Sequence, residues 1–579
     1  MFKLAHYLKY FKKEVILGPI FKLTEAIFEL IVPLVMAKII DVGIKNSDLP
    51  YIFKMGGLML LLGVAGLCFA LTCQYFAAKA SQGVGTVIRN DLYRRINTLS
   101  HAEIDRIGTP SLITRITNDV NQLQLAVAML IRLVSRAPFL VIGATVMSML
   151  LDLRLSLIFL LVMPLLALVL YLVMSRSVPF YRTIQKKLDR LSLITRENLS
   201  GVRVIRAFSK QNTEENRFNE ASDDLLKSSV MVGKIAALLN PLTFLIINFS
   251  ILAIIWFGGL RVDSGSLSQG QIIAFVNYMT QILLALVVVA NLVVIFTKAS
   301  ACGARVNEIL ETEPSVKETT KANVQTTTEP NRPAIELKHV SFSYSGTEEY
   351  ALRDVSAAIF PGETVGIIGG TGSGKSTLVH LLPRFYDVSE GEILINGVNV
   401  KDYPFPQLRS QIGLVPQRAV LFSGTLAQNL RWRKADASQE EMQNALDVAQ
   451  AAEFVSKLPD GFETTIEQGG RNLSGGQKQR LTIARALVGA PKILILDDSA
   501  SALDFATDAA LRRAIQRDVK DATVILVSQR VNTVKRADKI IVLDDGEVAG
   551  IGTHTELFEA CGEYREICLS QLSEKEAAQ

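Results

Sequence analysis

The sequence reads Gly369-Gly370-Thr371-Gly372-Ser373-Gly374-Lys375-Ser376, which fits G-x-x-x-x-G-K-[ST], the pattern of a phosphate-binding loop. Apolar residues 365–368 precede this loop as a predicted strand, and residues 376–382 continue it as a predicted helix. The glycines let backbone N–H groups point at phosphate at the start of that helix. We therefore expect Lys375 to contact the β- and γ-phosphates of a nucleotide, Ser376 to ligate Mg²⁺, and Thr377 to lie beside them.

A second segment supplies a carboxylate for the metal. Residues 493–497 read Ile-Leu-Ile-Leu-Asp, a run of apolar residues that ends in an acid. We expect a buried strand that presents Asp497 to the Mg²⁺ shell. Such a strand is weak evidence alone, but downstream of a phosphate-binding loop it strongly favours ATP and Mg²⁺ as cofactors. The later part of the chain is thus predicted to be an α/β P-loop domain.

The residues before about 310 are much more apolar than the rest of the chain. Of 579 residues, 49% are hydrophobic, and the mean hydropathy of +0.29 is high for a soluble protein. These values predict an α-helical polytopic membrane domain ahead of the α/β domain. Its six predicted transmembrane helices are the apolar runs of membrane-span length at 15–40, 55–78, 129–151, 155–175, 240–262 and 269–298.

Changes in composition along the chain set the predicted domain boundaries. A basic amphipathic elbow helix at 1–13 is expected to lie on the inner membrane surface. The transmembrane domain follows at 14–312, and residues 313–333, rich in Thr, Glu, Lys and Pro, are expected to be a linker. The nucleotide-binding domain is predicted at 334–579.

Many basic residues gather in the two long segments 79–128 and 176–239, although the net charge is only +5. Basic loops belong on the cytoplasmic side, so this charge indicates topology and not a nucleic-acid surface. Apart from Pro110 and Pro179 both segments lack proline. We expect them to extend the membrane helices by about 35–40 Å into the cytoplasm and to contact the nucleotide-binding domain. The prediction is a multi-pass protein of a bacterial cytoplasmic membrane.

The stretch Leu473-Ser474-Gly475-Gly476-Gln477 resembles the signature of the ATP-binding cassette (ABC) family. Other positions match motifs of that family: Tyr344 the aromatic that stacks on adenine, Gln417 the Q-loop glutamine at Mg²⁺, and Ser501-Ala502-Leu503-Asp504 the D-loop. Six spans fused ahead of one cassette resemble an exporter-type half-transporter. The resemblance implies two cassettes stacked head to tail, with each ATP between one P-loop and the opposite signature.

Three positions depart from the family pattern. Asp498 stands where the family has the glutamate that positions the attacking water, Gln529 stands where it has a histidine at the γ-phosphate, and Gln468 replaces an acid before the signature. Asp498 is one methylene shorter, and misplacing a catalytic group by about 1 Å can cost about 10²-fold in rate. Gln529 can donate a hydrogen bond but cannot carry positive charge.

Asp498 and Gln529 together resemble the degenerate ATP site of heterodimeric ABC exporters. The resemblance implies a second half-transporter as partner, whose competent site this chain's intact signature would complete. Two alternatives stay open: a homodimer that hydrolyses ATP slowly through Asp498, and a nucleotide-gated regulatory membrane protein.

Charged residues within the first predicted span bear on the cargo. Lys22, Glu25 and Glu29 lie at helical spacing along one stripe. A Lys22–Glu25 pair that locks the helix bundle and a cavity-facing acid that selects cationic amphiphiles are equally open readings. The family resemblance favours small hydrophobic or amphipathic cargo, drug-like or lipidic.

Overall fold

The computed structural model describes residues 2–319, 332–344, 349–499 and 502–577. The chain divides into two compact units. The helical unit comprises residues 1–97 and 110–311, and the α/β unit comprises residues 98–109 and 312–579. Much of the predicted linker lies outside the described residues.

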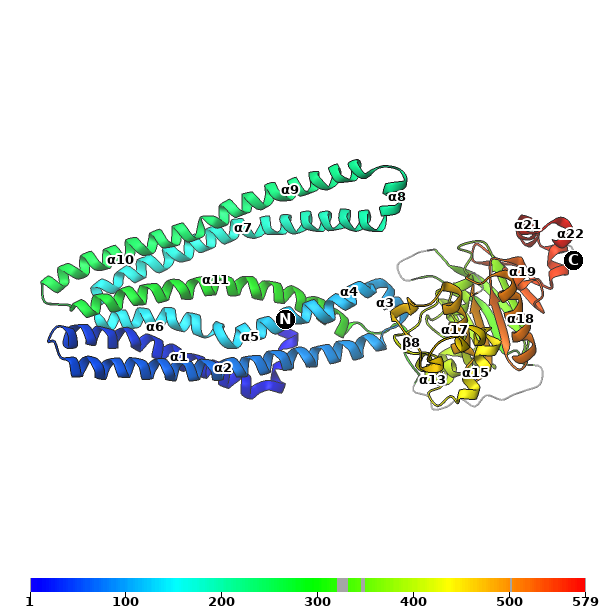
Figure 1. Ribbon diagram of the computed structural model, residues 1–579, viewed down its shortest axis with the longest axis horizontal. Coiled ribbons are helices and arrows are strands. Elements are labelled where there is room, and N and C mark those ends of the chain that lie inside the picture. The colour runs from blue at the N-terminus through cyan, green and yellow to red at the C-terminus, as the bar shows by residue number, and fades with distance from the viewer. Residues whose placement is uncertain (1, 320–331, 345–348, 500–501, 578–579) are drawn as a thin grey trace. The chain divides into compact units, whose positions relative to one another are not determined.

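Long helices that run side by side build the helical unit (Figure 1). Their bounds are η1 Phe2–Phe11, α1 Lys12–Lys38, η2 Ile39–Ile44, α2 Leu49–Thr98, α4 Thr109–Thr114, η3 Arg115–Asp119, α5 Val120–Met129, η4 Leu130–Val134, α6 Arg136–Leu151, α7 Leu153–Ser200, α8 Val202–Ala207, α9 Gln211–Ala237, α10 Leu239–Asp263 and α11 Gln269–Glu311. The segments η3 and η4 are π-helical stretches, so the chain from α4 to α6 is helical almost throughout.

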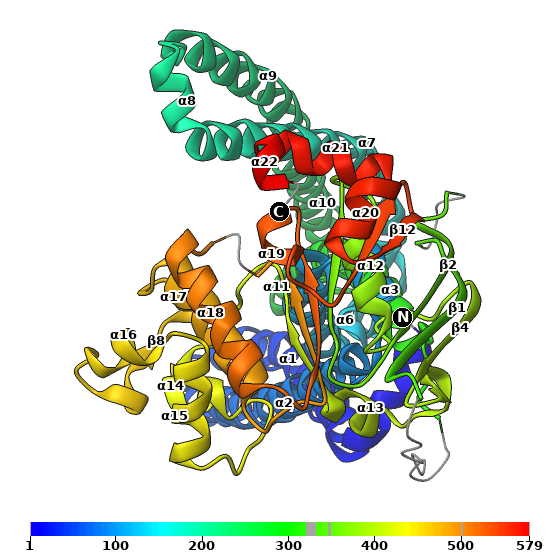
Figure 2. The same cartoon turned by 90° about the vertical axis from the view of Figure 1, so that its right-hand side faces the viewer.

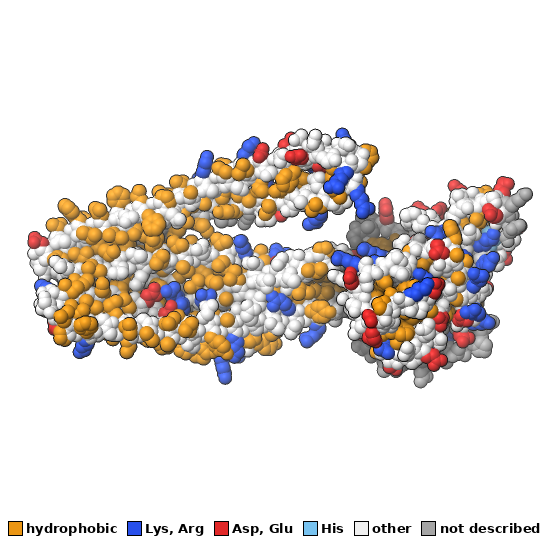
Figure 3. Space-filling model, in the orientation of Figure 1, with side chains coloured by type: hydrophobic (Ala, Val, Ile, Leu, Met, Phe, Trp, Pro, Cys, Tyr) orange, Lys and Arg blue, Asp and Glu red, His pale blue; other side chains and the backbone are white. Residues whose placement is uncertain are grey.

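Among the described residues, five helical segments are long and apolar enough to cross a membrane: 49–98, 109–151, 153–200, 211–263 and 269–311. Helix α1 is 27 residues long and accounts for the remaining predicted run, with Lys22, Glu25 and Glu29 among its apolar residues. Hydrophobic side chains cover much of the surface of this unit, with acidic and basic side chains side by side in one place within it (Figure 3). The predicted helical membrane domain is confirmed.

Several helices continue well beyond membrane-span length. Helix α2 has 50 residues and α7 has 48, and α7 continues through Pro179 without ending. Pro110 lies in the first turn of α4, where a missing N–H costs no hydrogen bond. The expectation that the long segments after the second and fourth apolar runs extend the membrane helices is therefore confirmed.

Two main sheets form the α/β unit. A six-stranded sheet has the order β12-β11-β3-β10-β9-β6, parallel except for β12, and a four-stranded antiparallel sheet has the order β2-β1-β4-β5. The strands are β1 Ile335–Phe342, β2 Leu352–Ile359, β3 Thr364–Gly369, β4 Glu390–Ile395, β5 Val398–Asn399, β6 Ile412–Val415, β7 Gly424–Thr425, β8 Thr465–Ile466, β9 Ile493–Asp497, β10 Thr523–Val527, β11 Lys539–Asp544 and β12 Glu547–Gly552. The short strands β7 and β8 pair separately.

Helices cover one face of the six-stranded sheet, and the antiparallel sheet lies on the other face together with the helix that follows the phosphate-binding loop (Figure 2). The helices of this unit are α3 His101–Ile107, α12 Lys375–Leu381, α13 Phe405–Gln411, α14 Leu426–Leu430, α15 Gln439–Val448, α16 Ala452–Ser456, α17 Gly475–Leu487, α18 Phe505–Asp518, α19 Val531–Val534, α20 His554–Ala560, α21 Gly562–Gln571 and α22 Glu574–Ala577. All five residues of β9 are buried, which explains its uninterrupted apolar sequence. The predicted α/β domain is confirmed.

Helix α3 belongs to the α/β unit, although its sequence lies between two membrane helices. The His101 ring packs 4.4 Å from the Phe385 ring, and Tyr386 Oη donates to Asp105 Oδ2 at 2.6 Å. The Val316 N–H donates to Ser100 Oγ at 2.9 Å, so the chain entering the unit is bound to the same helix. The expected contact between the first long inner segment and the nucleotide-binding domain is confirmed.

Candidate nucleotide site

The phosphate-binding loop joins the end of β3 to the start of α12, at the carboxyl edge of the parallel strands. Gly372 and Gly374 have φ angles of 86° and 90°, in the left-handed region that favours glycine. At Gly369 a Cβ atom would collide with the Leu543 carbonyl oxygen. The loop therefore requires glycine at these positions, and its N–H groups are left uncovered by side chains.

The Lys375 side chain folds into this loop. Its Nζ donates hydrogen bonds to the carbonyl oxygens of Gly369, at 3.0 Å, and of Gly370. Burial lowers the pKa of Lys375, and the nearby carboxylates of Asp498 and Asp497 oppose that shift. A buried ammonium gains most from an anionic partner, so the loop is chemically suited to phosphate.

Asp497 ends β9 and meets the first turn of α12. Ser376 Oγ donates to Asp497 Oδ1 at 2.9 Å. Burial raises the pKa of Asp497, whereas the hydrogen bond from Ser376 and the nearby His380 lower it. His380 Nε2 lies 3.7 Å from Asp497 Oδ2. The position of His380 beside Asp497 is not predictable from the sequence, because no spacing rule relates a residue of α12 to the end of a distant strand.

Asp498 is held in a fixed backbone conformation next to Asp497. Its φ angle is 42°, unusual for a residue with a side chain, and its N–H donates to the Val527 carbonyl oxygen at 2.9 Å. Gln417 Nε2 donates to Asp498 Oδ2 at 3.2 Å. The structure thus brings together three residues that the sequence placed in one site: Asp497, Asp498 and Gln417.

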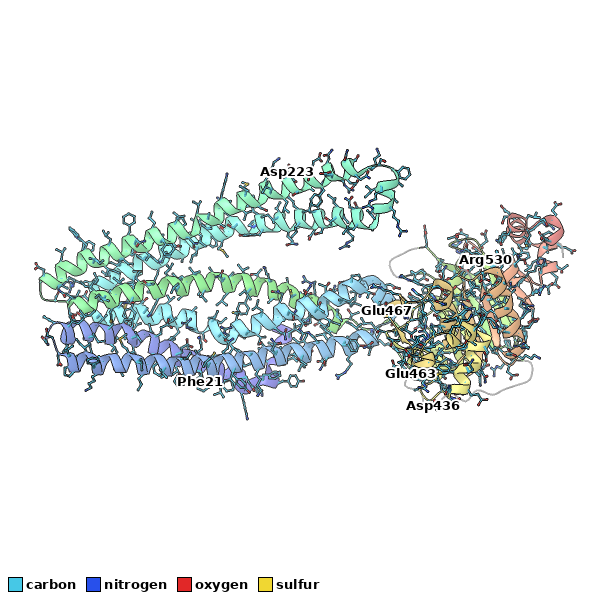
Figure 4. The ribbon with its side chains drawn as sticks, viewed as in Figure 1. Phe21, Asp223, Asp436, Glu463, Glu467 and Arg530 are labelled. Atoms are coloured by element: carbon cyan, nitrogen blue, oxygen red, sulfur yellow. The ribbon has the colours of Figure 1, made fainter. Side chains whose placement is uncertain are left out.

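Gln529 follows β10 on the far side of the same cleft. Its carbonyl oxygen accepts a hydrogen bond from Gln571 Nε2 at 2.7 Å. The next residue, Arg530, labelled in Figure 4, lies with its guanidinium 5.6 Å from the centre of the Phe505 ring. Contacts on both sides of Gln529 therefore fix this segment against α18 and α21.

These side chains line one cleft of about 230 Å³. A closed pocket for a whole small molecule is usually about 300–1,000 Å³, so the cleft is sized for the phosphate end of a nucleotide. Its walls are Thr371, Gly372, Gly374, Lys375, Ser376, Thr377, Gln417, Asp497, Asp498, Val527, Ser528 and Gln529.

Tyr344 lies at the end of the antiparallel sheet, beside the cleft wall. Its hydroxyl is 3.0 Å from Thr377 Oγ1, and its ring meets the Tyr386 ring edge-on at 5.4 Å. The side chain is 36% exposed, so one face is accessible. The stacking of adenine on Tyr344 stays a prediction.

The signature lies outside the cleft, at the start of α17. Ser474 caps this helix: Gln477 N–H donates to Ser474 Oγ at 3.3 Å, and the Ser474 N–H donates to Gln477 Oε1 at 2.9 Å. Gly475 is exposed, and a Cβ atom there would meet nothing within 4 Å. Gly476 lies in the same first turn of α17. Glu467, labelled in Figure 4, lies in the segment before the signature, and the Glu467 N–H donates to Asn472 Oδ1 at 3.1 Å.

Asp504 of the D-loop caps α18, outside the cleft. Its Oδ1 accepts from the Thr507 N–H at 2.8 Å, and that hydrogen bond holds the pKa of Asp504 below its usual range. Ser501 of the same motif lies outside the described residues. Gln468 is exposed.

The residues present fit magnesium and a nucleotide triphosphate. The cleft offers the buried ammonium of Lys375, uncovered N–H groups of the loop, the Ser376 hydroxyl and the Asp497 carboxylate. Hydroxyl and carboxylate oxygens are ligands that Mg²⁺ accepts beside phosphate oxygens. The described residues hold no group of three or more His, Cys, Asp or Glu arranged to bind a metal alone. Mg²⁺ is commonly held by one or two protein oxygen ligands together with phosphate oxygens of the nucleotide.

Comparison with known proteins identifies the family. Residues 15–286 match the ABC transporter transmembrane region, and residues 352–501 match the ABC transporter domain. An ABC transporter ATP-binding protein of Mycobacterium tuberculosis is 38% identical over 572 residues, covering 98% of this chain and 97% of the relative. This chain belongs to the ABC transporter family.

Other ABC transporters are similar over nearly the whole length. The ABC transporter ATP-binding protein YfiB of Bacillus subtilis is 40% identical over 552 residues, covering 95% of each chain. The ATP-dependent lipid A-core flippase of Hahella chejuensis is 33% identical over 537 residues, covering 90% of this chain and 88% of the flippase. A solved bacterial Atm1-family ABC exporter with ATP bound has the same fold, with a TM-score of 0.78, 24% identity and 99% coverage of both chains.

Membership of this family defines the broad activity of the chain. It is an ABC transporter with an exporter-type transmembrane domain fused to a nucleotide-binding domain, and that domain hydrolyses ATP to drive transport. The predicted exporter-type ABC family and the predicted enzyme class are confirmed, whereas the resemblance to the degenerate-site subunit of a heterodimer stays a prediction. The roles predicted for individual site residues stay predictions.

Proposed function

We propose that this ABC transporter is one half of a heterodimeric exporter of lipidic or drug-like amphiphiles, and that its own P-loop cleft is the slow ATP site of the pair. The observation that carries the proposal is the identity and setting of Asp498 beside Asp497. ABC exporters act as dimers, so each cleft is completed by a second chain.

The contacts around Asp498 prevent the backbone from compensating for its short side chain. The hydrogen bond from Asp498 N–H to Val527 and the one from Gln417 to its carboxylate hold the residue on both sides. A fixed backbone cannot advance to compensate for the missing methylene, so the carboxylate is withdrawn from an attacking water by about 1 Å, which can cost about 10²-fold in rate.

Gln529 weakens the same site by a second route. A positive or proton-carrying group at the γ-phosphate stabilises charge that develops in the transition state. The Gln529 amide can donate a hydrogen bond there but adds no charge. We therefore assign to this cleft tight ATP binding through Lys375, Ser376 and Asp497, with slow cleavage; Mg²⁺, when bound, would neutralise phosphate charge.

The open first turn of α17 supports the role of this chain in the partner's site. Ser474, Gly475 and Gly476 lie at the N-terminus of a 13-residue helix, where anions are favoured. Nothing in the described cleft uses them. They would complete the ATP site of a partner that carries glutamate and histidine at the matching positions.

The apolar helices and the relatives support an amphiphilic cargo. Relatives that are 32–33% identical are lipid A-core flippases, which act on a lipid. We place the protein in a bacterial cytoplasmic membrane with the α/β unit in the cytoplasm, because the relatives are bacterial and the inner segments are basic.

Turnover by the purified chain alone tests the proposal. The chain is reconstituted in nanodiscs by itself and with the half-transporter that co-purifies with it, and phosphate release is measured. We expect turnover alone to be slower by about 10²-fold than that of the pair. Asp498→Glu combined with Gln529→His should raise the turnover of the chain alone by about 10-fold or more.

The matched control is Asp497→Asn, which should abolish turnover by the chain alone, with and without the Asp498→Glu and Gln529→His changes, because it removes the proposed metal ligand. Fast turnover by the unaltered chain alone would overturn the slow-site assignment and favour the homodimer. ATP binding without turnover or transport in the pair would instead favour the regulatory alternative.

A further inference from the structure

The helical unit contains a polar cavity of about 100 Å³ among its membrane helices. Three elements contribute to it: α1, the η4–α6 segment and α11. It is lined by Glu29, Leu133, Arg136, Ala137, Leu140, Gln281, Leu284, Ala285 and Val288. The volume is several times the about 10–15 Å³ that one water molecule needs, so the cavity has room for a small head group.

The polar residues of this cavity lie deep in the membrane segments. Measured at 1.5 Å per residue from the helix ends at the short loops, Glu29, Arg136 and Gln281 lie about 14–22 Å inside their helices. The hydrocarbon core of a bilayer is about 30 Å thick, so these residues fall within it. Charged residues at such depth are costly and usually serve a function.

One ion pair dominates the cavity, and it is incompletely satisfied. Arg136 Nη2 donates to Glu29 Oε2 at 2.7 Å. Arg136 Nε and Gln281 Oε1 are buried and make no hydrogen bond to any described residue, although Gln281 Nε2 donates to the Glu29 carbonyl oxygen at 3.3 Å. One donor and one acceptor therefore lack partners beside the same cavity, in a medium where each omission costs free energy.

The neighbouring charged pair of α1 is different. Lys22 Nζ donates to both carboxylate oxygens of Glu25, at 2.8 and 2.6 Å, so both charges are neutralised within one helix. Neither residue lines the cavity. The pair that locks the helix is thus Lys22–Glu25, while the Glu29 side chain stays 38% exposed and that of Arg136 23% exposed.

The charge pattern selects among ligands. A purely cationic head group would meet the guanidinium of Arg136, and a purely anionic one would meet the carboxylate of Glu29. A head group that carries both charges satisfies every polar atom: its oxyanion accepts from Arg136 Nε–H, and its ammonium donates to Gln281 Oε1 and to Glu29. The apolar chain would follow the leucine side chains of the wall.

We propose that the Glu29–Arg136–Gln281 cavity is a binding site for the head group of a zwitterionic amphiphile, with an oxyanion next to a primary ammonium. The proposal rests on the proposed export of amphiphiles and narrows their class. It also revises the expectation that an acid in the first span favours cationic cargo, because the charge of Glu29 is shared with Arg136.

Binding of three lysolipid-like probes of equal chain length tests this site. The full chain in detergent micelles is titrated with lysophosphatidylethanolamine, with anionic lysophosphatidylglycerol and with a cationic alkylamine, and binding is followed by native mass spectrometry. We expect the zwitterionic probe to bind about 10-fold more tightly than either other probe, because one charge-assisted hydrogen bond is worth about that factor.

Charge-removing variants should shift the preference in opposite directions. Arg136→Gln should turn it toward the cationic probe, and Glu29→Gln toward the anionic probe, each with about 10-fold weaker binding of the zwitterion. Gln281→Leu leaves the ion pair intact and keeps the test valid if a charge variant fails to fold; it should weaken the zwitterion alone. The matched control, Lys22→Gln with Glu25→Gln, removes an equal pair outside the cavity and should change nothing.

Equal binding of all three probes, absence of binding, or the same preference in all variants would overturn the proposal and leave a cavity filled by water. The measurement uses neither nucleotide nor partner. A failed heterodimer assignment would leave the probe preference unchanged, and a failed cavity assignment would leave the turnover experiment unchanged.

Discussion

The P-loop cleft and the first turn of α17 are both anion sites of one α/β unit, but they differ in how far this chain completes them. In the cleft, Lys375 makes hydrogen bonds to the loop and Asp497 accepts one from Ser376, so this chain's own residues position both side chains. At α17 the Ser474 hydroxyl serves only its own helix cap, and Gly475 faces open space. Under the proposed function, the first surface binds the nucleotide of this chain's own cleft, and the second contributes to the nucleotide site of a partner chain.

The largest expected effect is on ATP turnover, and it distinguishes the first turn of α17 from the P-loop cleft. Ser474→Ala in the assembly with the partner should lower ATP turnover by about 10²-fold, because under the proposed function it removes a hydroxyl donor from the partner's ATP site. ATP binding by the altered chain alone should be unchanged, as measured by fluorescent nucleotide titration. Ser438→Ala is the matched control, since Ser438 caps α15 with the same reciprocal hydrogen bonds and lies elsewhere in the unit. Equal losses in both variants would reduce the role of Ser474 to helix capping.

A second prediction concerns the P-loop cleft, where nucleotide binding by the chain alone should be affected more than turnover by the pair. Lys375→Met should weaken ATP binding by the chain alone by about 10- to 100-fold, through loss of a charge-assisted contact to phosphate. The turnover of the pair should fall less than it does with Ser474→Ala, because the competent cleft is the partner's. Lys457→Met, at an exposed pair with Glu453, is the control and should leave nucleotide binding intact. Retained ATP affinity in Lys375→Met would contradict the assignment.

A third prediction compares the glycines of the two surfaces. Gly369→Ala should destabilise the unit by about 1–3 kcal/mol, because its Cβ would collide with the Leu543 carbonyl. Gly475→Ala should leave stability unchanged or slightly raised, because the same atom meets open space. Differential scanning calorimetry of the two variants measures the change in stability, and each kcal/mol lost should lower the Tm by about 2–4 °C. Equal Tm values would mean that the loop relaxes around a side chain.

The smallest expected effect concerns the pH dependence of stability at His101 of α3. Burial lowers the pKa of His101, with a further lowering by His380. The folded state therefore favours the neutral ring, and stability is lost as pH falls below about 6.5, where the unfolded ring gains its proton. Tm should fall between about pH 7.5 and about pH 5.5, and His101→Phe, which keeps an aromatic ring against Phe385, should reduce that fall. An identical fall in Tm in His101→Phe would mean that groups other than His101 cause the pH dependence.

Features that depend on a few neighbouring residues could be predicted from the sequence. The P-loop, the signature and β9 are contiguous patterns whose physics acts within a few residues, and the Lys22–Glu25 pair follows from helical spacing. The sequence could not predict contacts between distant segments. The approach of His380 to Asp497 and the pairing of Glu29 with Arg136 depend on how helices and strands pack, which no spacing rule contains.

The membership of α3 in the α/β unit has a consequence for biosynthesis. Its His101 and Asp105 leave the ribosome long before Phe385 and Tyr386, their packing partners. At about 5–20 residues per second, the helix waits roughly 15–60 s for them. The packing of the α/β unit against α3 is therefore completed only after the membrane helices between them in the sequence have been made.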